Sequence, residues 1–132
     1  MNENNQHIEA WIEKADHDLG SAKIIFTHMP DYFDTVAFHC QQAVEKYIKS
    51  VLLFYKFEFL FSHDLIYLLD LLDARRKVDE ATYDKAIKLD RFSVQIRYPN
   101  KKIYLSKEEL EYAIQVADYF REFTLKIIYG NK

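Results

Sequence analysis

Glycine and proline are scarce in this chain, with 2 of each among 132 residues. Tight turns depend on these two residues, so a fold built from many short strands is disfavoured. A phosphate-binding loop made of glycine amides is excluded, because such a loop needs several glycines in one short segment. The scarcity favours long helices joined by few turns.

Cysteine occurs once, as Cys40. A single cysteine excludes an internal disulfide and a zinc site built from several thiolates. His17 lies between Asp16 and Asp18, but adjacent residues on a helix point in different directions, so this trio does not predict a metal site. We therefore expect no metal and no cofactor.

An excess of positive charge and a long apolar run are also missing. The formal net charge is -3 at pH 7, which gives no long-range attraction to nucleic acid. The most apolar stretch, Val51–Phe61, contains Lys56 and Glu58 and is shorter than the roughly 20 residues that span a bilayer. The first residues, Met1–Asn5, do not resemble a signal peptide. The expected location is the cytoplasm, without a membrane partner.

Apolar residues spaced three and four apart fill most of the chain, and this spacing predicts amphipathic helices. The first helix is expected over residues 8–29. The second should follow a cap at Asp31 or Asp34 and end at Phe54 or Phe57. Its apolar positions fall on one continuous side, and Cys40 is among them.

Further capping signals mark the remaining helices. Ser62 predicts the start of a third helix and Asp79 the start of a fourth. Residues 92–105 lack helical periodicity and are predicted as the longest loop, a kind of segment that often carries function. Ser106 and Glu109 form a capping box for the last helix. The expected fold class is all-α, an up-and-down bundle of four to five helices.

Four segments, in this order, resemble the HEPN domain family. They are Trp11–Ala22, similar to the family's W…A..DL..A; Asp34–Lys49, similar to YD.A.FH.QQA.EK.LK; Ser62–Leu65, similar to THDL; and Arg97–Pro99, similar to RYP. The resemblance extends over nearly the whole chain. It implies a single HEPN-like helical domain over residues 1–132.

The resemblance also implies partners. HEPN domains commonly dimerise, are linked to nucleotide or RNA binding, and often work beside a small nucleotidyltransferase. We therefore expect a homodimer, with a nucleotidyltransferase, a nucleotide or RNA as further partners. Some relatives are ribonuclease toxins of two-component toxin–antitoxin systems.

The pattern typical of these ribonucleases is an arginine followed four to six residues later by a histidine. The arginines of this chain begin at Arg75, and they come after every histidine: His7, His17, His28, His39 and His63. No arginine precedes a histidine at any spacing. We therefore expect a binding module rather than an enzyme, with no catalytic residues. A ribonuclease toxin is the disfavoured alternative, and a ligand-free dimeric adaptor is another.

Polar residues on the second helix form the candidate binding site. His39, Gln42, Lys46 and Lys49 are separated by three, four and three residues, so they share one side of the helix. An imidazole, an amide and two ammonium groups suit a phosphate or a nucleotide. The loop would complete this site with Arg97 as a bidentate phosphate ligand and Tyr98 as a stacking platform.

A structural interpretation of the same residues stands beside this one. His39 and Gln42 would then only form hydrogen bonds within the bundle, and the two lysines would be solvated. Glu45 and Lys49 form an ordinary i,i+4 pair. His63 and Asp64 are interpreted as capping residues rather than as catalytic ones.

Overall fold

The computed structural model describes residues 3–59, 62–96 and 105–130 of the chain. Five α-helices and one 3-10 helix make up this part, without any strand. In chain order they are α1 (Glu3–His28), η1 (Pro30–Thr35), α2 (Val36–Phe54), α3 (Leu65–Asp73), α4 (Glu80–Ile96) and α5 (Lys107–Tyr129). The predicted all-α bundle is confirmed. Among the described helices, none is long and apolar enough to cross a membrane.

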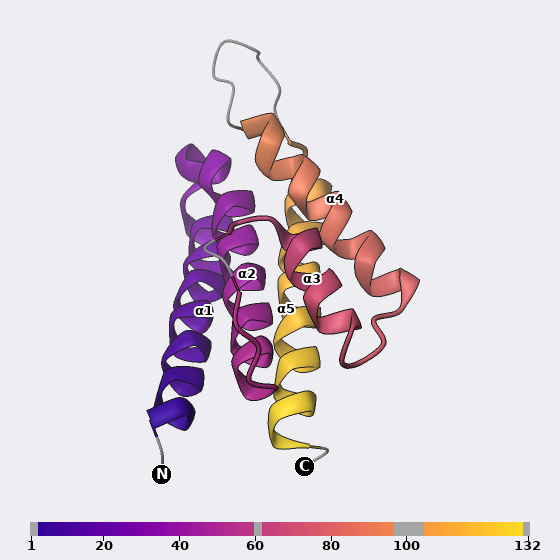
Figure 1. Ribbon diagram of the computed structural model, residues 1–132. Helices are drawn as coiled ribbons and strands as arrows, with labels where there is room; N and C mark the ends of the chain where they lie inside the picture. The colour runs from indigo at the N-terminus through magenta and orange to yellow at the C-terminus, as the bar shows by residue number, and fades with distance from the viewer. Residues whose placement is uncertain (1–2, 60–61, 97–104, 131–132) are drawn as a thin grey trace.

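The central element of the bundle is α2 (Figure 1). It makes its most extensive contacts with α1 and α5, and it also packs against α3 and α4. Figure 1 shows α1, α2 and α5 extending lengthwise beside one another, with α4 inclined relative to them. Each flank of α2 therefore meets side chains that are distant in the sequence.

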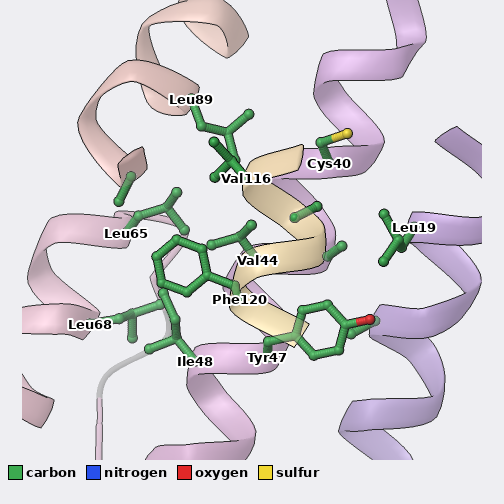
Figure 2. Close-up of a cluster of buried hydrophobic side chains, with 14 of the residues drawn as sticks. Leu19, Cys40, Val44, Tyr47, Ile48, Leu65, Leu68, Leu89, Val116 and Phe120 are labelled. Atoms are coloured by element: carbon green, nitrogen blue, oxygen red, sulfur yellow. The ribbon is translucent and has the colours of Figure 1, made fainter. Parts of the chain in front are cut away.

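Apolar side chains from several helices form the core around α2. Figure 2 shows a part of it, with Leu19, Cys40, Val44, Tyr47, Ile48, Leu65, Leu68, Leu89, Val116 and Phe120 labelled. Burying a large apolar side chain stabilises the fold by about 1.5–3 kcal/mol. Polar residues of α2, including Glu45 and Lys49, are buried as well. The helix is covered around most of its circumference, so its polar groups require partners within the protein.

Two helix starts differ from the predicted ones. The segment that contains Asp31 and Asp34 forms η1, so neither residue caps α2. Thr35 is the N-cap of α2, and its side chain makes no capping hydrogen bond. The Oγ1 of Thr35 donates to the carbonyl of Tyr32 instead, at 2.7 Å. Ser62 is not the cap of α3, because the Asp64 carboxylate accepts from the backbone amides at the start of that helix.

Other helix boundaries agree with the prediction. The Asp79 carboxylate accepts from the backbone amide of Thr82 at 2.8 Å, as expected of a cap before α4. Ser106 and Glu109 form both bonds of the predicted capping box. The second helix ends at Phe54, one of the two predicted positions. Local sequence signals predicted these two caps correctly, because each cap is a hydrogen bond between one side chain and a backbone amide in the first turn of the helix.

The fourth helix is longer than predicted. Residues 92–96, expected to begin the loop, belong to α4, and Phe92 is buried against the core. The remaining residues of the predicted loop up to 104 lie outside the described residues. Ile87 of this helix has an exposed fraction of 37%, and Thr82 is buried.

Cys40 should be nearly inert to thiol reagents in the folded protein. Its side chain is fully buried, and burial raises the pKa of the thiol from the usual 9.0 to about 12, because the thiolate loses its hydration. The thiolate fraction at about pH 8 is then roughly 1,000-fold smaller than that of a free thiol. We expect negligible labelling by a chromogenic disulfide reagent without denaturant and rapid labelling in urea. Comparable rates in both conditions would contradict this burial.

Candidate functional site

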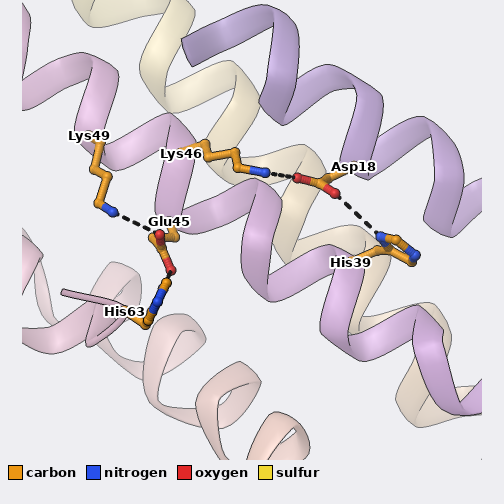
Figure 3. A network of polar contacts seen from close by, with 6 residues as sticks. All are labelled: Asp18, His39, Glu45, Lys46, Lys49 and His63. Atoms are coloured by element: carbon orange, nitrogen blue, oxygen red, sulfur yellow. Dashed lines mark hydrogen bonds and ion pairs between the residues drawn. The ribbon is translucent and has the colours of Figure 1, made fainter. Parts of the chain in front are cut away.

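Charged and polar groups gather along the side of α2 that faces α1 and the segment before α3 (Figure 3). Two contact clusters make up this region, which we call the polar face of α2. Its members are Asp18, His39, Glu45, Lys46, Lys49 and His63. It contains three of the six residues predicted for the binding site.

The first cluster is centred on Asp18, which α1 directs toward α2. The Nδ1 atom of His39 lies 3.3 Å from Oδ1 of Asp18, and the Lys46 ammonium donates to Oδ2. The side chains of Asp18, His39 and Lys46 are 18%, 27% and 21% exposed. The cluster is therefore open to a ligand from solvent, but its charges are only partly screened by water.

The second cluster is centred on Glu45 and is more deeply buried. The Lys49 ammonium donates to Oε2 of Glu45 at 2.8 Å, and Nδ1 of His63 lies 2.8 Å from Oε1. The side chains of Glu45 and Lys49 are only 4% and 3% exposed, whereas that of His63 is 51% exposed. The amide of Gln41 donates to the carbonyl of His63 at 3.3 Å, which ties the segment before α3 to α2.

Trp11 of α1 extends the second cluster. The Lys49 ammonium lies 5.4 Å from the centre of the Trp11 ring, which is within the range of a cation–π interaction. The buried ammonium thus has both a carboxylate and an aromatic partner. This arrangement offsets part of the cost of removing Lys49 from water.

The charge of the polar face depends on its histidines. Each carboxylate is shared between one lysine and one histidine. With neutral histidines the face has no net charge, and with both charged it carries a formal charge of about +2. Nδ1 of each ring faces a carboxylate.

The predicted site residues are only partly brought together. His39 and Lys46 share Asp18, but Lys49 belongs to the buried Glu45 cluster. Gln42 is half-buried on the same helix. Arg97 and Tyr98 lie outside the described residues, so their part in a site stays a prediction.

Two details of the structural interpretation are wrong. Lys49 is not solvated: its predicted i,i+4 pair with Glu45 forms, but the pair is buried. His63 does not cap α3, because its ring contacts Glu45 and Asp64 provides the cap. Contacts of α2 with His63 and with Trp11 of α1 change both interpretations, and helical spacing alone cannot show such tertiary contacts.

The prediction did not include Asp18, Trp11 or Glu45 among the site residues. A signal for the first two was present in the sequence. Positions 11 and 18 are two helical turns apart and therefore share one side of α1. An aromatic ring and a carboxylate on the flank of an amphipathic helix indicate contact with polar groups of a neighbouring helix.

A separate polar cluster joins three helices on the other flank of α1. Oδ1 of Asp16 accepts from the Tyr47 hydroxyl and, at 3.0 Å, from Nε of Arg121. Burial and then the bond to Asp16 raise the pKa of Tyr47 above its usual range, so the hydroxyl stays protonated and donates. This cluster fixes α1, α2 and α5 relative to one another. Within the described residues, no group of three or more metal-binding side chains is assembled.

The helical architecture and the family model agree. The HEPN domain model matches residues 8–128, so the chain belongs to the HEPN domain family. The fold is similar to that of TT1696 from Thermus thermophilus, with a TM-score of 0.79, 24% identity, and 91% of this chain and 97% of that chain covered. It is also similar to ST0689, an archaeal HEPN homologue, with a TM-score of 0.67 and 18% identity, and the match covers 92% of this chain and 97% of that chain. No curated protein matches the sequence.

Proposed function

We propose that this chain is a non-catalytic HEPN module whose polar face of α2 binds the phosphate group of a nucleotide or of RNA. The charge balance of this face carries the proposal, because four basic groups share two carboxylates. Counted with neutral histidines, this face carries no net charge, whereas the whole chain carries a formal net charge of -3. Charged donors to phosphate form the stronger class of hydrogen bonds.

The contact groups of the proposed site are His39 and Lys46, since both are partly exposed. Asp18 holds them in place, and a bound phosphate would share their donors with this carboxylate. Gln42 lies between them on α2 and would add an amide donor. Lys49 is too deeply buried to reach a ligand, so its part is to anchor Glu45. Arg97 and Tyr98 would add a bidentate phosphate contact and a stacking surface.

Thermal unfolding with a panel of ligands tests this function. ATP, GTP, a short single-stranded RNA and inorganic tripolyphosphate are added separately at low salt. A ligand that binds only the native state stabilises it by about 2.7 kcal/mol at 100 times its Kd, so at least one of them should raise the melting temperature. A shift with RNA alone would identify RNA rather than a free nucleotide. An unchanged melting temperature with all four would leave protein docking as the function.

The alternative is RNA cleavage, and one observation favours it. Nδ1 of His39 and Nδ1 of His63 each face a carboxylate, an arrangement that orients an imidazole as a general base. The sequence has no arginine ahead of a histidine, so we expect the RNA of the panel to stay intact on a denaturing gel in the presence of a metal chelator. Cleavage that is lost in His63→Ala or His39→Ala would establish the enzyme instead.

Homodimer formation and pairing with a nucleotidyltransferase belong to the same proposal and rest on membership of the family. Ile24, Tyr32 and Phe38 are 59%, 54% and 49% exposed, and large exposed apolar side chains are common at protein interfaces. Light scattering during size-exclusion chromatography would give the mass of the particle. A ligand-free adaptor would show a dimer by this measurement and no ligand-induced shift in melting temperature.

A further inference from the structure

A small cavity lies on α1 beside the polar face of α2. Its volume is about 180 Å³, and the described residues that line it are His7, Ala10, Trp11 and Lys14. These residues follow the spacing of one side of the helix, so α1 itself forms this wall of the cavity. An indole and a methyl group provide an apolar surface, and an imidazole and an ammonium group accompany it.

We propose that this cavity, the Trp11 pocket, receives the base of the nucleotide or RNA whose phosphate lies on the polar face of α2. The inference rests on the proposed function and adds a position for the aromatic part of the ligand. The volume of the cavity favours the base alone as its occupant, because pockets that hold a whole drug-sized ligand measure about 300–1,000 Å³. The Trp11 pocket holds one planar ring system, so the sugar and the phosphate must lie outside it.

The chemistry of the Trp11 pocket agrees with this occupant. Every base has an apolar π-face that stacks on an aromatic side chain, whatever its hydrogen-bonding pattern. Lys14 lies one turn after Trp11 and His7 one turn before it, so both can donate to a sugar or a phosphate. The expected preference is therefore for a base joined to an anionic group, with little discrimination among the bases.

The Trp11 pocket is also next to the proposed phosphate site. The ring of Trp11 lies 5.4 Å from the Lys49 ammonium, and Lys49 contacts Glu45 on the polar face. Asp18 is two turns after Trp11 on the same side of α1 and contacts His39 and Lys46. One ligand could therefore place its base against α1 and its phosphate against α2.

The fluorescence of Trp11 provides a direct test, because it is the only tryptophan of the chain. AMP, adenosine and ribose 5-phosphate are titrated into the full-length protein, with emission and calorimetric heat measured in parallel. We expect AMP and adenosine to change the emission, and ribose 5-phosphate to bind without changing it. Trp11→Leu should weaken AMP binding about tenfold, because losing a base–aromatic stack costs about one order of magnitude or more in affinity.

Two further variants make the outcome decisive. Trp11→Phe keeps an aromatic ring and should retain most of the AMP affinity even if Trp11→Leu folds poorly. Tyr129→Leu removes another exposed aromatic side chain, on α5, and should leave AMP binding unchanged. If AMP binds by calorimetry while Trp11 emission stays constant and Trp11→Phe and Trp11→Leu bind as the unmodified protein does, the Trp11 pocket is wrong and the proposed function stands. If neither AMP nor ribose 5-phosphate binds and the short single-stranded RNA does not raise the melting temperature either, both proposals fail.

Discussion

Replacing Lys49 with methionine should destabilise the protein by about 3–5 kcal/mol, the cost of leaving one member of a buried ion pair without its partner. Lys49 and Glu45 are 3% and 4% exposed, so water cannot replace the lost ammonium. His63 would remain beside Glu45, but it is half-exposed and cannot fill the space of the lysine side chain. Urea unfolding followed by circular dichroism measures the change in the free energy of unfolding.

The exposed pair between Lys23 and Asp118 provides the matched control. These side chains are 48% and 45% exposed, and their atoms are 2.8 Å apart, the same distance as in the buried pair. Lys23→Met should therefore cost less than about 1 kcal/mol. The double variant Glu45→Leu with Lys49→Met should recover much of the lost stability, since it removes both buried charges together. Equal costs for Lys49→Met and Lys23→Met would contradict the burial of the Glu45 cluster.

Replacing Asp18 with asparagine should strengthen phosphate binding and weaken the fold. The substitution removes the carboxylate that competes with a ligand for His39 and Lys46. A unit charge about 4 Å from another near a protein surface contributes roughly 1–4 kcal/mol, so a gain of about tenfold in affinity for AMP is expected. The free energy of unfolding should fall by about 1–3 kcal/mol, because two charged contacts are lost. Calorimetric titration and urea unfolding give the two values.

Asp118→Asn separates a local effect from a change in net charge. It alters the net charge by the same amount, but Asp118 is on α5 and pairs with Lys23. We expect less than a twofold change in AMP affinity for this variant, because exposed charges farther away are screened by salt. Equal gains for both variants would show general electrostatic attraction rather than a site at Asp18.

Much of the fold could be predicted because it depends on local signals. The apolar spacing of the helices, the box of Ser106 and Glu109, and the cap at Asp79 each involve residues within one or two turns. The errors occurred where tertiary contacts decide the outcome. The predicted capping residues of α2, Asp31 and Asp34, lie inside the 3-10 helix η1 instead. Phe92 packs against the core, and α4 extends into the predicted loop.

The candidate site was less accessible to prediction from sequence. Helical spacing placed His39, Lys46 and Lys49 on one side of α2, but it could not show that each would have a carboxylate partner. Asp18 is 28 positions from Lys46, and only the packing of α1 against α2 joins them. Burial of Lys49 likewise depends on the cover provided by other segments. A polar stripe read from sequence thus identifies candidates, whereas their partners decide which of them can reach a ligand.

Calorimetric titration of AMP into Lys46→Met tests the proposed site most directly, with Lys88→Met as the control. Lys88 lies on α4, with its ammonium 4.7 Å from the centre of the Tyr112 ring and away from the polar face of α2. Removing the Lys46 ammonium should lower AMP affinity at least tenfold, because the donor is lost and Asp18 is left unpaired beside the phosphate. Lys88→Met should bind as the unmodified protein does. Equal affinity for AMP in all three proteins would contradict a phosphate site on the polar face of α2.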